Sequence, residues 1–415
     1  MKKPKPKSRR EKGKRKSGGQ VGHPGETLSM VDVADEIVVH SVIVCDHCHQ
    51  NLESVEVAYV LKRQVFDIPP MQLQVSEHQA EVKVCPACRK RSGGQFPEGV
   101  NAPTQYGVNL LAQAAYLNAY HLMPLARVRE WFEDCVGHAV SEGVIERAVA
   151  QLSDKIAPAL DVIYDGLTCA QTVHFDETGF RIKGQTAWLH TACTDWLSYY
   201  TVHAKRGDEA MLDAGVLPNC HAWAVHDGLK AYFGFETVRH ALCNVHHLRE
   251  LQFALEQYNA TWAQDMQILL LKMKSKREAD DLSPQCIADL ESDYERLLYK
   301  GFQDFPIQAR PPNTLRLVAQ HPVTNLLIRL RDYRDAVLAF LHHPEVPFDN
   351  NLAERDLRMM KVKQKISGCF RTWLGAEVFA AVRTYFATAR KQGISMLTAA
   401  SLAFAGSPFF PAIPE

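Results

Sequence analysis

The sequence predicts a mixed α/β protein made of several domains. Between residues 172 and 226, short segments rich in apolar and β-branched residues are separated by turns, which is typical of strands. Helical periodicity dominates on both sides of this region, and two Cys-x-x-Cys pairs precede it. A chain of 415 residues is long enough for about two to four domains.

Residues 1–28 are expected to form a disordered basic arm. Ten of the first twenty residues are Lys or Arg and only Glu11 is acidic, although the net charge of the whole chain is zero. So few apolar side chains cannot offset the entropy of ordering. Such an arm contacts phosphates by releasing counterions, and a solvated tail that only aids solubility is the alternative. The expected DNA-binding residues here are Lys12, Lys14, Arg15 and Lys16.

Residues 29–105 are predicted to form a zinc ribbon. Two Cys-x-x-Cys pairs supply four thiolates, the ligand set of a closed structural zinc site, and a redox pair or free thiols are the alternative. The candidate ligands are Cys45, Cys48, Cys85 and Cys88. Between the pairs, Val55–Val65 and Gln72–Val84 alternate apolar with polar residues, which predicts half-buried strands.

Residues 106–168 are predicted to be a small helical domain. Apolar residues recur at helical spacing, Pro124 is placed to start one helix and Ser141 to cap another. Short helices of this kind resemble a helix-turn-helix reader, which makes Arg127 a candidate DNA contact. A helical connector with solvated arginines explains the same pattern.

The predicted strands from residue 172 onward have a definite order. A strand ending at Asp176 is followed by two more, a helix at 207–214 leads to a fourth, and Asp227 comes directly after it. The other three strands are Thr186–Cys193, Leu197–His203 and Ala222–His226. An antiparallel meander followed by a helix and a strand beside the first is the ribonuclease-H-like order. We therefore assign residues 169–251 and 346–395 to a ribonuclease-H-like catalytic domain.

Three carboxylates mark the candidate active site. Asp176 and Asp227 should lie side by side, and Glu354 follows the N-cap cluster at 349–351, in the first turn of a predicted helix. Taken alone, the two aspartates could be ordinary turn formers. Hard oxygen ligands suit Mg2+ or Mn2+, and three carboxylates are what a two-metal phosphoryl-transfer site requires.

The remaining segments complete the expected organisation. Residues 252–345 are too long for a loop in a compact domain and read as an all-helical insertion, whereas residues 396–415 are expected to be a C-terminal tail. Basic residues just beyond Glu354 are placed to neutralise phosphates, with a solvated basic face as the alternative. They are Lys361, Lys363, Lys365 and Arg371.

The chain resembles the DDE transposases of bacterial insertion sequences, specifically the insertion-sequence-66 type. The resemblance runs through nearly the whole chain and depends on motifs that occur in the family's order. They are Ser17–Gly25, the two cysteine pairs, His121–Leu125, His174–Thr178, Asp227-Gly228, Cys243–Leu251, Asn350–Arg355 and Thr388–Gly393.

This resemblance implies that Asp176, Asp227 and Glu354 form the catalytic triad of a DNA transposase. It also implies that double-stranded DNA, as transposon ends and target, is the partner, and that the chain forms a homo-oligomer on DNA. Helper proteins of the same element are candidate partners. A zinc-dependent DNA-binding protein descended from a transposase, and another ribonuclease-H-like nuclease such as a junction resolvase, are the alternatives.

The expected location is the bacterial cytoplasm, in association with the nucleoid. No segment approaches the roughly 18 uninterrupted apolar residues of a membrane span, and the N-terminus lacks the apolar core of a signal peptide.

Overall fold

The computed structural model describes residues 27–309 and 318–413. The chain divides into two units, and the sheet and helices belong to the unit that begins at Leu73. The basic arm that the sequence predicts for residues 1–28 lies almost wholly outside the described residues.

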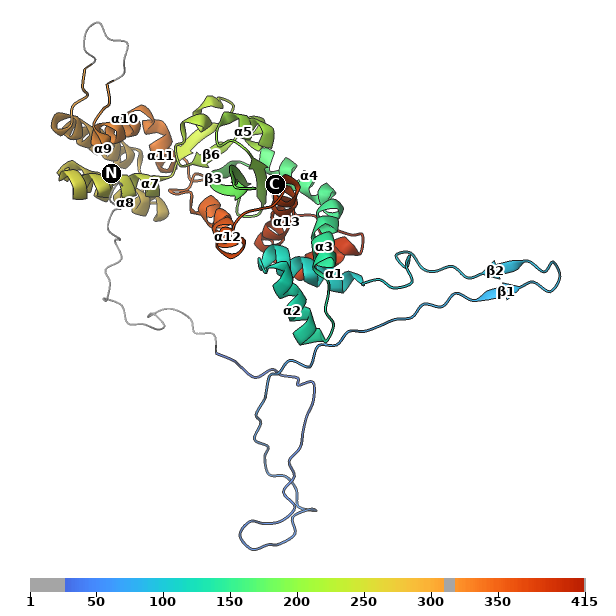
Figure 1. Cartoon of the computed structure of the whole chain (residues 1–415). Coiled ribbons are helices and arrows are strands. Elements are labelled where there is room, and N and C mark those ends of the chain that lie inside the picture. The colour runs from blue at the N-terminus through green and yellow to red at the C-terminus, as the bar shows by residue number, and fades with distance from the viewer. Residues whose placement is uncertain (1–26, 310–317, 414–415) are drawn as a thin grey trace. The chain divides into compact units, whose positions relative to one another are not determined.

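A mixed sheet forms the centre of the larger unit (Figure 1). Its strands, within the described residues, are β3 (Thr172–Ile182), β4 (Gln185–Cys193), β5 (Ser198–His203), β6 (Trp223–His226) and β7 (Arg239–Leu242). They lie in the order β5-β4-β3-β6-β7. β3, β4 and β5 form the predicted antiparallel meander, and β6 runs parallel to β3, as the sequence predicted.

The structure corrects one predicted strand and adds another. β3 does not end at Asp176 but continues to Ile182, because its second half pairs with β4 as far as Gln185 and turns at Lys183-Gly184. Gly184 has a φ of +80°, a conformation that glycine adopts without steric cost. The sequence analysis missed β7, which pairs in parallel with β6.

Short helices connect the strands beyond the meander. The predicted helix at 207–214 is α5 (Asp208–Ala214), and α6 (Val216–Asn219) leads from it to β6. A 3-10 helix, η2 (Lys230–Gly234), lies between β6 and β7. The connection from the meander to β6 is therefore helical and brings β6 back beside β3.

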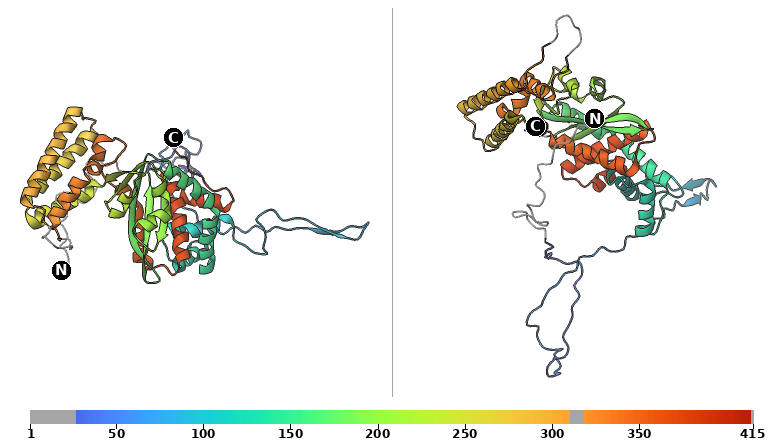
Figure 2. Two further views of the ribbon diagram at one scale, coloured as in Figure 1. Left: turned by 90° about the horizontal axis from the view of Figure 1, so that it is seen from above. Right: turned by 60° about the vertical axis from the view of Figure 1, so that its left-hand side comes forward.

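Two long helices cover part of the sheet. α12 (Asn351–Ser367) and α13 (Trp373–Lys391) contribute Leu357 and Phe379 to a core shared with Phe180 of β3 and Leu189 of β4. Figure 2 shows the red helices against the green strands. Burying a side chain as large as Phe contributes about 1.5–3 kcal/mol, so this contact anchors α12 on the strand that carries Asp176.

The helical region before the sheet shares its core with the C-terminal helices. It contains α1 (Val108–Ala115), the π-helix η1 (Tyr116–Tyr120), α2 (Leu125–Val136), α3 (Glu142–Lys155) and α4 (Ala157–Thr168). Pro124 and Ser141 occupy the N-cap positions of α2 and α3, where the sequence placed them. α3 packs against both α13 and α14 (Met396–Phe404), and α1 packs against α14.

The last part of the chain differs from the prediction because it joins this shared core. Residues 396–404 were expected to begin a tail, but they form α14, because Ala399, Ala400 and Ala403 fit closely into the helical core. Beyond it, the backbone N–H of Ala412 donates to Gln392 at 2.9 Å.

Residues between β7 and α12 are helical in their described parts. The helices are α7 (Asn244–Tyr258), α8 (Thr261–Glu278), α9 (Pro284–Asp304), α10 (Pro322–Asp332) and α11 (Arg334–His342). The predicted helical runs Trp262–Lys276 and Gln285–Lys300 lie within α8 and α9. Their core surrounds Trp262 and Tyr294, both fully buried.

The cysteine-rich region contains less strand than predicted. β1 (Val82–Val84) and β2 (Arg91–Gly93) form a short hairpin around the second cysteine pair, and Val44 bridges Asn51 around the first. Val55–Val65 and the first part of Gln72–Val84 are not strands, and their apolar side chains are mostly exposed. An alternating pattern specifies a strand only where a second layer buries one face.

No helix among the described residues is long and apolar enough to cross a membrane.

Candidate active site

The register of the sheet brings Asp176 and Asp227 together. His174 pairs with Val225 in the parallel ladder, so two further residues along each strand lead to Asp176 and Asp227. Their carboxylate oxygens, together with one from Glu177, all lie within 4.8 Å of one another. The sequence predicted that the two aspartates would be neighbours, and the parallel pairing of β3 with β6 is the reason that they are.

Asp176 lies in an environment that opposes its negative charge. Burial raises its pKa to about 7, and the charges of Glu177, Asp227 and Glu354 act in the same direction. The N–H of Glu177 donates to Asp176 Oδ1 at 2.9 Å and partly offsets this effect. A divalent cation would remove the remaining repulsion, which makes this position a candidate metal ligand.

Asp227 is held by the turn that follows β6. Its Oδ1 accepts the N–H of Leu229 at 2.9 Å, and Gly228 has a φ of +88° that glycine tolerates. The N–H of Gly228 donates to Nδ1 of buried His226 at 3.1 Å, so Nε2 of His226 carries the proton and faces His240. Burial lowers the pKa of His226 to about 3, so a neutral imidazole supports the turn.

Glu177 is a site residue that belongs to the His174–Thr178 motif but whose role was not predicted from the sequence. Its side chain is fully buried, accepts a hydrogen bond from Tyr232 at 2.7 Å and pairs with Arg206 at 2.7 Å. Arg206 also lies 3.7 Å from Asp227 Oδ2. Burial raises the pKa of Glu177, while Tyr232 and Arg206 lower it. Sequence spacing could not reveal the pair, because Arg206 comes from the segment beyond β5.

Glu354 occupies the first turn of α12, as predicted. Its carboxylate lies 3.8 Å from His246 Nε2 and 3.8 Å from an Arg249 nitrogen, and both partners belong to α7. Glu354 is near enough to Asp176 to raise the pKa of that residue, but it is not in the close group of Asp176, Glu177 and Asp227. The third predicted carboxylate therefore faces the other two from a neighbouring helix.

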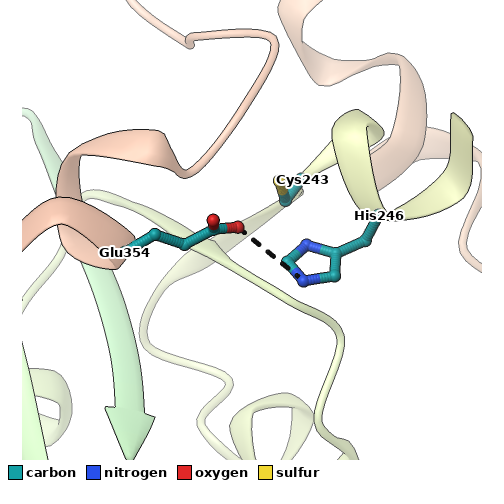
Figure 3. Close-up of side chains that lie close together, drawn as sticks. All are labelled: Cys243, His246 and Glu354. Atoms are coloured by element: carbon teal, nitrogen blue, oxygen red, sulfur yellow. Dashed lines mark ion pairs between the residues drawn. The ribbon is translucent and has the colours of Figure 1, made fainter. Parts of the chain in front are cut away.

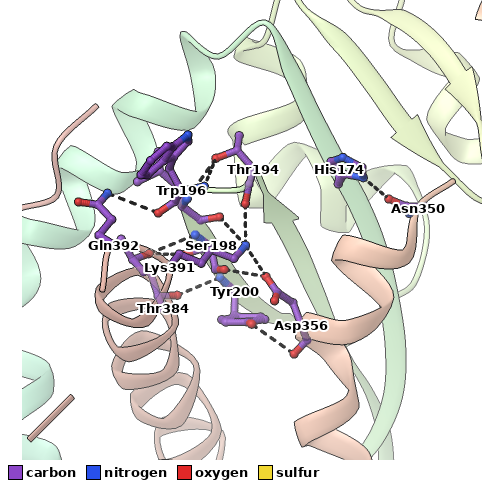
Figure 4. Close-up of polar contacts among 12 residues, drawn as sticks. His174, Thr194, Trp196, Ser198, Tyr200, Asn350, Asp356, Thr384, Lys391 and Gln392 are labelled. Atoms are coloured by element: carbon purple, nitrogen blue, oxygen red, sulfur yellow. Dashed lines mark hydrogen bonds and ion pairs between the residues drawn. The ribbon is translucent and has the colours of Figure 1, made fainter. Parts of the chain in front are cut away.

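Asn350 fixes the start of α12 against β3. Its side-chain N–H donates to the carbonyl of Phe175 at 2.7 Å, and its Oδ1 lies 2.8 Å from His174 Nδ1 (Figure 4). The backbone N–H of Asn350 donates to Cys243 Sγ at 3.2 Å. Although the sequence placed Asn350 in an N-cap cluster, its side chain makes no helix-capping hydrogen bond and instead crosslinks the segments around the carboxylates.

The predicted phosphate-contacting residues differ in their surroundings. Lys361, Lys365 and Arg371 are exposed, and Lys361 Nζ donates to the carbonyl of Gly179 at 2.8 Å. Lys363 is half-buried beside two phenylalanine rings, and burial lowers its pKa. Arg127 is exposed on α2 and paired with Glu130 at 2.6 Å. Lys12, Lys14, Arg15 and Lys16 lie outside the described residues.

The two cysteine turns have the same local structure. The N–H of Cys45 donates to Gln50, and that of Cys85 donates to Lys90, at 2.9 Å in both turns. His49 and Arg89, four residues after the first cysteine of each pair, both have a φ of +57°.

Backbone N–H groups within each turn also point at sulfur. Those of Cys48 and His47 lower the pKa of Cys45, and those of Cys88 and Ala87 lower the pKa of Cys85. Each turn thus favours a thiolate, which is the form that binds zinc.

The donor atoms at the two locations suit different metals. The carboxylate group around Asp176 and Asp227 offers oxygen only and fits Mg2+ or Mn2+. The cysteine turns offer sulfur and fit Zn2+.

Comparison with known families gives two matches. The model described as the Transposase IS66 family matches residues 103–378, and the model described as the zinc-finger binding domain of transposase IS66 matches residues 43–89. A search of curated proteins found no match. The first match covers more than half of the chain and contains Asp176, Asp227 and Glu354, and the second contains all four paired cysteines.

Proposed function

The chain belongs to the IS66 transposase family, and we propose that it cleaves DNA at the ends of a bacterial insertion sequence and joins those ends to a target. The catalytic residues in this proposal are Asp176, Asp227 and Glu354. The observation that carries it is the meeting of Asp176 and Asp227 at adjacent parallel strands, with the charge of Glu354 acting on Asp176.

We assign the sheet and its covering helices to a ribonuclease-H-like domain. The strand order β5-β4-β3-β6-β7, with an antiparallel meander followed by parallel β6 and β7, supports this assignment. In this reading, residues 252–345 are a helical insertion between the second and third catalytic carboxylates.

The carboxylates would hold Mg2+ or Mn2+. Such ions, when bound, lower the pKa of an attacking water or DNA 3′-hydroxyl and stabilise the leaving oxygen. Backbone N–H groups of Glu177 and Leu229 fix Oδ1 of Asp176 and of Asp227, and Oδ2 of Asp227 lies 3.7 Å from Arg206.

Positive side chains near the carboxylates would orient the DNA. Arg206 is already beside Asp227, and Lys361, Lys365 and Arg371 are exposed along and just beyond α12. A phosphate between these groups would be neutralised from two sides. Lys363 is the weakest candidate of the predicted set, because its surroundings are largely apolar.

We propose that Cys45, Cys48, Cys85 and Cys88 bind one structural zinc. The matching turns and their N–H groups directed at sulfur support the ligand set, as does the match to the family's zinc-finger domain. A zinc-stabilised unit next to a basic arm is suited to recognising double-stranded DNA. We also propose that the chain forms a homo-oligomer on DNA and that helper proteins of the same element are candidate partners.

A strand-transfer assay tests this function. The purified chain is incubated with Mg2+, a target duplex and labelled DNA from the natural ends of its element, and Asp227→Asn is the matched control. We expect joined products with the wild-type chain and none with the variant. Shifted DNA without products would indicate a DNA-binding protein, and cutting confined to branched DNA would indicate a resolvase; either result would contradict the proposal.

A further inference from the structure

A second group of metal-binding side chains lies beside the carboxylates of Asp176 and Asp227. Cys243 Sγ, an imidazole nitrogen of His246 and a carboxylate oxygen of Glu354 all lie within 4.8 Å of one another. Figure 3 shows Glu354 extending from α12 toward His246 of α7, with Cys243 beside them. Residues more than a hundred positions apart are thus brought to one point, where α7 and α12 begin.

Two polar atoms in this group have no hydrogen-bond partner in the described part of the chain. They are His246 Nδ1 and Glu354 Oε1, and both are buried. The closest charged contact of Glu354 Oε1 is His246 Nε2 at 3.8 Å, which is too long for a hydrogen bond. Arg249 pairs with the other oxygen, Oε2. Buried polar atoms are rarely left unpaired, and an ion held between His246 Nε2 and Glu354 Oε1 would give the glutamate oxygen the partner that it lacks.

Backbone N–H groups are directed at the sulfur of Cys243, as they are at Cys45 and Cys85. Cys243 Sγ accepts the N–H of Asn350 at 3.2 Å, and N–H groups of His246 and Val245 also point toward it. Burial raises the pKa of this thiol to about 11, while these N–H groups lower it.

We propose that Cys243, His246 and Glu354 form a second transition-metal site of the zinc class, separate from the oxygen-only group around Asp176 and Asp227. Sulfur and imidazole donors select zinc or cobalt over magnesium. Zinc bonds of about 2.0–2.2 Å to nitrogen and oxygen place two such tetrahedral ligands roughly 3.3–3.5 Å apart, so the 3.8 Å between His246 Nε2 and Glu354 Oε1 would need to shorten by only a few tenths of an ångström.

Three protein ligands leave the fourth position of a tetrahedral ion open to water or to another donor. The site should therefore bind its ion more weakly than the four-cysteine ribbon and exchange it more readily. An ion there would fix the Glu354 carboxylate to the start of α7. The inference depends on the geometry of these side chains and not on DNA chemistry, although it shares Glu354 with the proposed function.

Cobalt titration tests the site, because a thiolate bound to Co2+ gives a near-ultraviolet charge-transfer absorption. The full-length chain, with its ribbon already filled by zinc, is titrated with Co2+ alone. We expect one equivalent to produce this absorption, whereas Co2+ held by the oxygen-only group produces none. No further binding, or binding without the absorption, would overturn the proposal.

Variants identify the ligands. Cys243→Ala should abolish the absorption, and His246→Ala, at a half-exposed position that tolerates truncation, should weaken Co2+ binding at least tenfold. Cys220→Ala is the matched control, because Cys220 is also a buried thiol but its Sγ donates to the carbonyl of Leu167. An absorption that persists in Cys243→Ala would come from the ribbon and would refute the site.

One further variant separates this inference from the proposed function. Asp227→Asn removes a carboxylate of the oxygen-only group and leaves all three ligands of the second site intact. It should therefore bind Co2+ with the wild-type absorption even though strand transfer is lost. Loss of the absorption in this variant would show that the two groups are a single metal site, which contradicts the inference.

Discussion

The side chain of Asn350 is hydrogen-bonded to the imidazole of His174, with 2.8 Å between Oδ1 and Nδ1. His174 lies two residues before Asp176, and Asn350 lies four residues before Glu354. Because the amide N–H of Asn350 donates to Phe175, its Oδ1 must accept, so His174 Nδ1 carries the proton. This buried contact joins the strand of one candidate catalytic carboxylate to the helix of another.

Replacing Asn350 should therefore weaken both the fold and the site. Asn350→Leu leaves the carbonyl of Phe175 and Nδ1 of His174 buried without partners, and we expect the free energy of unfolding to fall by about 2–4 kcal/mol. Urea denaturation measures this change. Asn351→Ala is the control, because the backbone N–H of Asn351 donates to Asp349 and alanine keeps that hydrogen bond. Equal stability of the two variants would show that the crosslink contributes nothing.

Arg206 should substitute in part for a divalent cation. Without metal, its guanidinium is the positive group closest to Glu177 and also faces Asp227. Because Arg206 is partly exposed, we expect Arg206→Met to lower the free energy of unfolding in chelator by only about 1–2 kcal/mol.

Magnesium should stabilise Arg206→Met more than it stabilises the wild type. Thermal unfolding with and without Mg2+ should show a larger rise in Tm for Arg206→Met than for the wild type, since the variant has more repulsion to relieve. Lys205→Met, which removes an exposed pair with Glu209, should respond as the wild type does. An equal rise in all three chains would show that Arg206 does not neutralise the carboxylates.

The ion pair between Lys391 and Asp356 should be important for stability. Both side chains are largely buried, with 2.9 Å between Nζ and Oδ2, and Lys391 also donates to the carbonyls of Thr194 and Leu197 (Figure 4). Lys391→Met leaves Asp356 buried without its cation, so we expect a loss of about 3–5 kcal/mol in denaturant unfolding. Lys300→Met, in an exposed pair with Asp265, should change stability by less than about 1 kcal/mol. The hydroxyl of Ser198 also donates to Asp356 Oδ2, at 2.6 Å, and a small loss for Lys391→Met would mean that this bond is enough to satisfy the carboxylate.

Zinc should be tightly bound by the ribbon and needed for DNA recognition. After brief treatment with a weak chelator, elemental analysis should find one zinc per wild-type chain. Cys45→Ser and Cys85→Ser should lose that zinc together with binding to element-end DNA, because the ion supplies folding energy to a region with few buried residues. Cys169→Ser, at an exposed unpaired cysteine, should retain both. Zinc retained in full by Cys85→Ser would remove that residue from the ligand set.

Much of the sheet could be predicted from sequence, because apolar and β-branched runs such as Thr186–Cys193 have few other stable structures. β7 could not be predicted, since its four residues include Arg239 and His240 and gain their strand character only by pairing with β6. Of the strands expected between the cysteine pairs only Val82–Val84 forms, for the opposite reason: the alternating pattern exists, but no second layer in the described part of the chain buries one of its faces.

The candidate site was predictable where local signals mark it. Asp227 follows a short apolar strand, and Glu354 follows a capping cluster, so both positions could be recognised without a structure. The contribution of Glu177 could not, because it depends on a partner 29 residues away. The crosslink made by Asn350 spans 176 residues and follows only from how α12 packs on β3.

The most direct test of the proposed catalytic role of the carboxylates is the cleavage of element-end DNA by Asp176→Asn in Mg2+. DNA binding is measured on the same preparation. The substitution removes one charge and almost no volume. We expect cleavage and strand transfer to fall by roughly a thousandfold or more, with DNA binding at the wild-type level. Cleavage at the wild-type rate would contradict the assignment of Asp176 as a catalytic metal ligand.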